Sequence, residues 1–242
     1  MQVFEVAFNI AYLTFIWTLV GLMTRRMKDV APEDRRTAEW IRLAFLLLAF
    51  GDTGHVGFRV VAYALGQMDV RVNVFGTPMA LLGLGSLATA VTLTLFYIAM
   101  VYVWQFRFGH PDSGIANFLV LAGVIRLFIL ALPSNGWESL GSPYLISLCR
   151  NLFLVIQGLG IMALILRDSF RRGDRTFQWI GWMIAVSYAF YLPVVLWVHR
   201  FPMLGMLMIP KTCAYVAIAW IAYRALWFRR ALPLARPAGA EA

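Results

Sequence analysis

The sequence predicts an all-α polytopic membrane protein: a seven-transmembrane-helix bundle with its N-terminus outside and its C-terminus in the cytoplasm. Of its 242 residues, 61% are hydrophobic and only 14% are charged, whereas a soluble domain carries about 25% charged residues. Seven apolar segments reach the roughly 20 residues that an α-helix needs to cross a bilayer. Lys and Arg concentrate in alternate connections between these segments, as the positive-inside rule requires.

The predicted spans follow one another through short connections, which favours a single domain. They are Val3–Met23, Trp40–Leu65, Met79–Trp104, Ala116–Leu132, Tyr144–Leu166, Trp179–Val198 and Met203–Leu226. No basic segment precedes the first span, so we expect a retained anchor and not a cleaved signal peptide. We therefore expect one seven-helix domain over residues 1–230. Residues 231–242 are rich in Ala and Pro, and we expect a disordered cytoplasmic tail there.

The basic residues in the connections and at the ends of the spans predict the orientation. Fifteen of them fall on one side of the membrane if the seven spans alternate, and only Arg71 and Arg200 fall on the other. The fifteen are Arg25, Arg26, Lys28, Arg35, Arg36, Arg42, Arg107, Arg167, Arg171, Arg172, Arg175, Arg224, Arg229, Arg230 and Arg236. This side is the cytoplasm. The net charge of +9 follows from this bias, so we expect no nucleic-acid partner.

One polar stripe stands out inside the second span. The run 51–55 reads Gly-Asp-Thr-Gly-His, and Arg59 follows one turn later. Asp52, His55 and Arg59 are spaced i, i+3 and i+7, which places them on one face of a helix. Ionisable groups are costly in lipid, so this face is expected to line a bundle interior or a wet cavity.

Four cations lie well within predicted spans: Arg59, Arg126, Arg150 and Lys211. Each costs roughly 2.5–3.5 kcal/mol near the bilayer centre on insertion scales. Asp52 is the one acid deep in a span, so an anion is the natural missing partner. All four cations fall in the outer half of the bundle, which predicts one outward-leaning cationic cavity. The structural alternative is local pairing or snorkelling to lipid phosphate.

Neighbouring polar residues extend this candidate ligand-binding set, while metal chemistry finds little support. Asn151 follows Arg150, and Tyr191 lies two residues before Pro193 inside the sixth span. The chain has three histidines, only one of them deep in a span, so we expect no haem or zinc site. Cys149 and Cys213 lie in apolar segments and are interpreted as small buried residues.

Two segments carry a family resemblance. The run 51–55 and the run 205–212, Gly-Met-Leu-Met-Ile-Pro-Lys-Thr, resemble parts of uncharacterised bacterial seven-helix integral membrane proteins. The resemblance covers most of the chain. It implies a multi-pass protein of the bacterial inner (cytoplasmic) membrane and a single bundle, but it supplies no activity.

Three functions remain open. The first is binding of a small anionic molecule or an anionic lipid headgroup, for transport or sensing, with His55 and Asp52 setting the charge balance beneath the cations. A weak similarity between residues 89–107 and 212–230 hints at a three-plus-one-plus-three repeat, which is typical of transporters. A sensor would require a partner signalling protein, and the sequence leaves homo-oligomerisation open.

The second function is an intramembrane lipid hydrolase or transferase in which Asp52 orients His55 as a general base. The third is a photoreceptor with retinal on Lys211, one of only two lysines in the chain. The third span has no carboxylate to serve as a Schiff-base counterion, so Asp52 would have to replace it. We expect no other cofactor and rank binding or transport first.

Overall fold

Seven long α-helices form the computed structural model, which describes residues 2–67, 69–74, 76–139 and 142–228, with side chains from Ala7 onward. Each predicted span is confirmed as a helix long and apolar enough to cross a membrane. The helices are α1 (Gln2–Arg25), α2 (Arg35–Ala64), α3 (Leu81–Phe108), α4 (Gly114–Ala131), α5 (Tyr144–Arg172), α6 (Arg175–Trp197) and α7 (Met208–Trp227). The tail predicted to be disordered, residues 231–242, lies outside the described residues.

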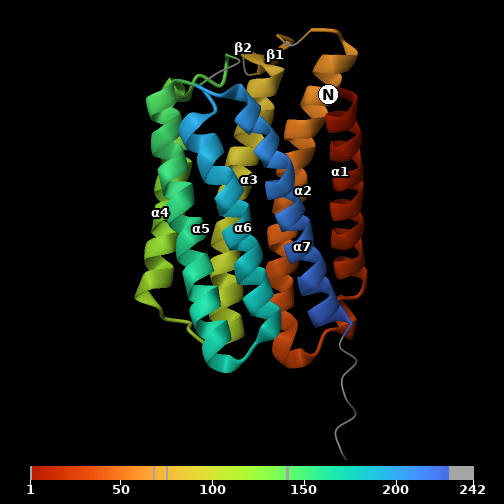
Figure 1. The fold of residues 1–242 in the computed structure, drawn as a ribbon, viewed down its shortest axis with the longest axis vertical. Coiled ribbons are helices and arrows are strands. Elements are labelled where there is room, and N and C mark those ends of the chain that lie inside the picture. Colours follow the sequence, from red (N-terminus) through yellow and green to blue (C-terminus); the bar gives the residue numbers. More distant parts are fainter. Residues whose placement is uncertain (1, 68, 75, 140–141, 229–242) are drawn as a thin grey trace, which may run out of the picture.

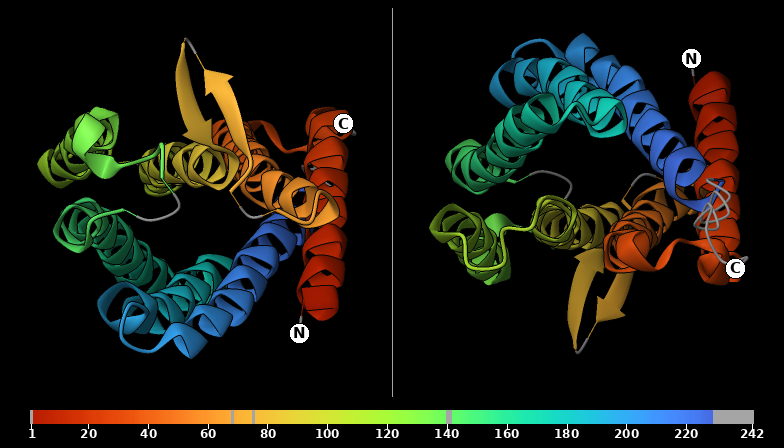
Figure 2. Two further views of the ribbon diagram at one scale, coloured as in Figure 1. Left: turned by 90° about the horizontal axis from the view of Figure 1, so that it is seen from above. Right: turned by 90° about the horizontal axis from the view of Figure 1, so that it is seen from below.

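The helices follow one another around the bundle in chain order, and α1 closes the ring against α7 (Figures 1 and 2). The most extensive packing joins α2 to α3, and α3 also reaches α5 across the interior. Along the bundle axis, α1 lies across the side where α2 and α7 face each other (Figure 2). Large exposed side chains such as Phe128, Leu145 and Trp179 cover the outer surface, as expected for lipid-facing positions.

One element departs from the predicted all-α fold. Two short strands, β1 (Arg71–Val74) and β2 (Thr77–Ala80), pair antiparallel between α2 and α3, with Val74 opposite Thr77. Gly76 has a φ of +86°, a left-handed conformation that glycine adopts without steric cost. The hairpin delays the start of the third helix to Leu81, two residues after the predicted start.

Short 3₁₀ segments complete the connections. They are η1 (Met27–Asp29), η2 (Pro32–Asp34), η3 (Pro133–Asn135) and η4 (Pro202–Leu207). The last of these occupies the start of the predicted seventh span, so α7 itself begins only at Met208. Pro210 therefore stands in the first turn of α7, where a missing N–H is tolerated.

Successive connections alternate between the two ends of the bundle (Figure 1). The basic connections that follow α1, α3 and α5 lie at the end opposite the hairpin. Lys and Arg are therefore concentrated at this one end of the bundle. An ion network holds this basic end together. Arg107 at the end of α3 contacts Asp34 and lies 2.7 Å from Asp174. Asp174 is also the N-cap of α6, where it accepts a hydrogen bond from Phe177 N.

Both cysteines are exposed, which corrects the expectation that they are small buried residues. Cys149 lies on α5 and Cys213 on α7, and each points to the outside of the bundle. An apolar neighbourhood in a membrane span does not separate core from lipid, because lipid is as apolar as a protein core.

Candidate functional site

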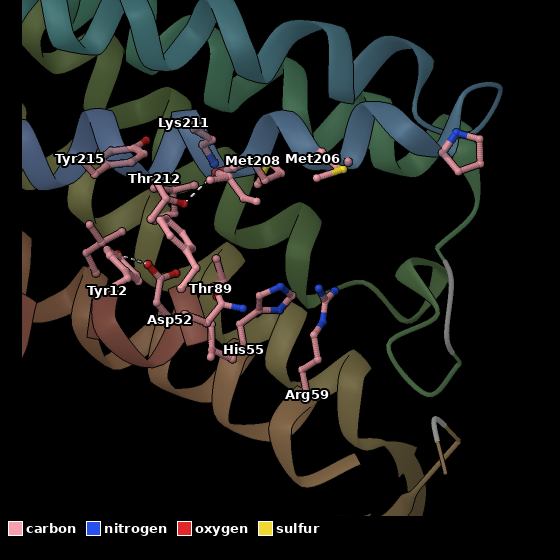
Figure 3. A pocket seen from close by; sticks show the side chains of 18 residues that line it. Tyr12, Asp52, His55, Arg59, Thr89, Met206, Met208, Lys211, Thr212 and Tyr215 are labelled. Atoms are coloured by element: carbon pink, nitrogen blue, oxygen red, sulfur yellow. Dashed lines mark hydrogen bonds between the residues drawn. The ribbon is translucent and has the colours of Figure 1, made fainter. Parts of the chain in front are cut away.

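The polar stripe of α2 lines a cavity of about 460 Å³. Asp52, His55 and Arg59 all belong to its wall, as their spacing predicts (Figure 3). Arg59 lies nearest the hairpin end and Asp52 deepest (Figure 3). This volume falls within the range of small-molecule sites, about 300–1,000 Å³.

Small residues bring the stripe close to α3. A Cβ on Gly85 of α3 would lie 2.9 Å from His55 Cα, and a Cβ on Gly51 would overlap the Thr92 side chain. A Cβ on Gly54 would lie 3.2 Å from the Cβ of Ala88 on α3. These glycines thus serve the close helix packing that small residues commonly support in membranes. They also fix the position of the α2 wall of the cavity.

The rest of the wall comes from α1, α3, η4 and α7. The additional lining residues are Phe8, Asn9, Tyr12, Leu48, Val56, Thr89, Leu93, Pro202, Gly205, Met206, Met208, Ile209, Lys211, Thr212 and Tyr215. Residues from opposite ends of the sequence therefore build one site.

Asp52 is held from α1. Tyr12 donates a hydrogen bond of 2.5 Å to Asp52 Oδ2, and the Tyr12 side chain is buried. Trp17, also on α1, donates to Oγ1 of Thr53, the residue next to Asp52, at 2.9 Å. Thr89 of α3 donates to the Gly51 carbonyl at 3.0 Å. The carboxylate is therefore oriented by the covering helix at the floor of the cavity.

Lys211 reaches the same cavity from α7, on the wall opposite Asp52 (Figure 3). The residue is 7% exposed and lies nine positions after Pro202, the first residue of the candidate span 202–227. Its ammonium lies 4.4 Å from the ring centre of Tyr191 and 5.7 Å from that of Tyr215. Among the residues that the structure describes, no carboxylate forms an ion pair with it.

The other two cations occupy a different place. Arg126 and Arg150 are absent from the cavity wall, contrary to the expectation that all four share it. Arg126 is 2% exposed and donates to the carbonyls of Arg150 and Ala90 at 2.8 and 2.7 Å, and to Thr94 Oγ1. It thereby connects α3, α4 and α5 through neutral acceptors.

Arg150 is satisfied by the α4–α5 connection. Its guanidinium donates to Asn135 Oδ1 and Ser142 Oγ, each at 3.0 Å, and lies 4.4 Å from the Trp137 ring centre. Both of these acceptors are neutral. This geometry favours a structural role for Arg150.

Tyr191 links the two groups of cations. Its ring faces Lys211, while its hydroxyl donates to Asn151 Oδ1 at 3.0 Å. Asn151 itself is outside the cavity wall. Of the eight predicted binding residues, four line the cavity, and Tyr191 contacts Lys211 from outside the wall and is hydrogen-bonded to Asn151.

Sequence reasoning missed a layer of buried tyrosines in the bundle interior. Tyr97 and Tyr215 share a hydrogen bond of 2.7 Å, and Tyr188 donates to the Leu154 carbonyl at 2.8 Å. Tyr is common at membrane interfaces, so its type alone gives no signal. The spacing of Asn9 and Tyr12 by three residues inside an apolar span was an available sign of a polar face on α1.

Within the described part of the chain, no three His, Cys, Asp or Glu side chains come together as a metal site. His110 lies at the basic end, where its ring stacks on Trp104 and its Nε2 lies 3.3 Å from Asp168. Comparisons with protein-family models, curated proteins and solved structures find no match to this chain.

Proposed function

We propose that this multi-pass membrane protein binds a small anionic molecule or an anionic lipid headgroup in the cavity between α1, α2 and α7. The observation that carries the proposal is Lys211. This cation is buried and faces the cavity, Asp52 stands across the cavity from it, and no carboxylate among the described side chains forms an ion pair with it. A buried cation that no carboxylate contacts directly is unfavourable, and an anionic ligand bound between the two walls would make that contact.

The arrangement of the wall supports an anion at this position. Arg59 adds a second positive charge nearer the hairpin end, and Asn9, Thr89 and Thr212 add neutral polar groups. Asp52 is occupied by the Tyr12 hydroxyl, which keeps the carboxylate oriented. Arg126 and Arg150 have neutral partners within the bundle and contribute at most a long-range positive field.

The proposed setting is the bacterial inner membrane, with the hairpin end outside and the basic end in the cytoplasm. The bias of Lys and Arg toward one end supports this orientation. The cavity then lies in the outer half of the bundle. Transport and sensing both remain consistent with such a site, and a sensor would act through a partner signalling protein.

One observation favours a second candidate, the retinal-binding photoreceptor. Lys211 and Asp52 project into one cavity from opposite walls, and a protonated Schiff base on Lys211 would have Asp52 as its acid across the cavity. The nearest groups to the Lys211 ammonium are the uncharged rings of Tyr191 and Tyr215. A protonated Schiff base would therefore have no counterion in direct contact, and we rank anion binding first.

Native mass spectrometry of protein released from a mild detergent tests the proposal, combined with a visible absorption spectrum. We expect an anionic adduct on the wild type and on Lys28→Met, and its loss in Lys211→Met. Lys28 is the matched control because it is the other lysine and lies exposed in η1, at the basic end. Adducts that are the same in Lys211→Met, or absent from all three proteins, would contradict anion binding. A covalent adduct with a visible band would favour the photoreceptor.

A further inference from the structure

A second cavity, of about 430 Å³, lies at the basic end of the bundle, where the end of α3 meets the connection from α5 to α6. This connection is at the end opposite the hairpin (Figure 1). The charged and polar residues of its wall are Arg107, Arg172, Asp174, Arg175 and Thr176. The wall shares no residue with that of the first cavity, so the basic end has a cavity of its own.

Two of the three arginines in this wall have no carboxylate partner. Asp174 lies 2.7 Å from Arg107, which accounts for the one acid of the wall. Among the residues that the structure describes, neither Arg172 nor Arg175 forms an ion pair with a carboxylate. Arg172 is nevertheless held in place, because it donates to the Phe108 carbonyl and its guanidinium lies 5.5 Å from the centre of the Phe108 ring. A guanidinium group binds phosphate oxygens through two parallel hydrogen bonds, so this pair of arginines suits a phosphate.

The outer face of α6 continues from this cavity along the bundle. Arg175, Trp179 and Trp182 are spaced i, i+4 and i+7, which places them on one face of the helix. Trp179 is 59% exposed and Trp182 is 49% exposed, and both lie in the candidate span 175–197. Trp is enriched where a membrane protein meets the headgroup region. A ligand with its phosphate at Arg175 would therefore have a path for an apolar chain along this face, which favours a phospholipid over a soluble phosphate.

We propose that this second cavity binds the phosphate of an anionic phospholipid such as phosphatidylglycerol, with its acyl chains along the Trp179 and Trp182 face of α6. Basic pockets between transmembrane helices bind anionic headgroups in this way. The ammonium of a zwitterionic headgroup repels the guanidinium groups, so the site prefers a lipid with net negative charge. In the proposed orientation this lipid belongs to the cytoplasmic leaflet. The site is independent of anion binding in the cavity between α1, α2 and α7.

Native mass spectrometry of the full chain, released from nanodiscs that contain phosphatidylglycerol and phosphatidylcholine in equal amounts, tests the proposal. The measured quantity is the ratio of the two lipids that remain bound. We expect the wild type to retain phosphatidylglycerol in preference. Each basic residue near a membrane surface contributes about fivefold to the binding of anionic lipid. Arg175→Gln should therefore reduce the ratio about fivefold, and Arg172→Gln combined with Arg175→Gln about twenty-fivefold.

The matched controls are Arg171→Gln and the pair Arg171→Gln with Arg224→Gln. They remove the same charge from the same end, and both residues are exposed and absent from the wall. We expect both controls to keep the wild-type ratio. Controls that lose as much as the cavity variants would show a general effect of charge and overturn the site. A wild type without preference, or an unchanged ratio in the cavity variants, would overturn it as well. Arg175→Gln keeps the test decisive if the double variant does not fold, because Arg175 is exposed at the first residue of α6.

Two further measurements separate a lipid from a soluble phosphate. Glycerophosphoglycerol, the same headgroup without acyl chains, should not displace the bound phosphatidylglycerol, and its displacement at equal concentration would overturn the lipid. Trp179→Ser should weaken retention of phosphatidylglycerol several-fold. Trp197→Ser is its control, because Trp197 is 50% exposed at the other end of the same helix. Equal effects of the two variants would contradict the path of the chains along α6.

Discussion

Removing the guanidinium of Arg107 is expected to destabilise the basic end of the bundle far more than removing an exposed partner. Arg107 contacts two carboxylates, with side chains that are 21% exposed for Arg107, 15% for Asp34 and 13% for Asp174. Charge-assisted hydrogen bonds contribute about 1.5–3 kcal/mol each. Taking the lower value for two contacts near the surface, Arg107→Met should lose about 3 kcal/mol and leave two carboxylates facing one another.

The matched comparison is Arg35→Met. Arg35 lies 3.6 Å from Glu39 with side chains that are 61% and 48% exposed, and such a pair contributes about 0–1 kcal/mol. Reversible unfolding in mixed micelles, with the SDS fraction as the variable, gives both free energies. Replacing Asp174 by Asn in the Arg107→Met background should recover part of the loss, because one stranded charge is removed. A loss below about 0.5 kcal/mol for Arg107→Met, or equal losses for both variants, would refute the reasoning.

Three further predictions concern the site and the topology. Tyr12→Phe removes the donor to Asp52 and should cost about 2 kcal/mol in the same assay; an unchanged unfolding curve would mean that Asp52 needs no donor from α1. Gly85→Ala should lose about 1–3 kcal/mol because its Cβ would meet His55 Cα at 2.9 Å, while Gly57→Ala, with open space around it, should lose none. A C-terminal fusion should fluoresce as green fluorescent protein and be inactive as alkaline phosphatase, and the reverse result would contradict the cytoplasmic C-terminus.

The spans could be predicted because spanning length and hydropathy are local properties of the sequence. The stripe of Asp52, His55 and Arg59 was also predictable, because helical spacing alone places the three on one face. One cavity for this stripe and Lys211 was predicted from depth along the spans, and the packing of α1, α2 and α7 gives that cavity its walls. The hairpin of residues 71–80 escaped prediction because each strand has only four residues.

The shared cavity for four cations could not be derived from sequence depth. Arg126 has the expected depth, but its rotation directs the guanidinium toward Thr94 and two helix carbonyls. Rotation depends on neighbouring helices and not on position along the span. The same ambiguity explains Cys149 and Cys213, which lie on exposed helix surfaces.

The depth of Lys211 makes the cavity electrically sensitive. Six residues of 3₁₀ helix at about 2.0 Å each and three of α-helix at about 1.5 Å each place it about 16 Å along a span that crosses a hydrocarbon core of about 30 Å. Moving one elementary charge across the whole membrane changes its energy by about 2.3 kcal/mol per 100 mV. A singly charged ligand at the depth of Lys211 crosses about half of the membrane, so a voltage of about 100 mV changes its binding free energy by about 1 kcal/mol. In the proposed orientation an inside-negative voltage drives a bound anion outward and weakens its affinity about fivefold. Depolarisation would then fill the cavity, and its occupancy would report the energisation of the membrane as well as the concentration of the ligand.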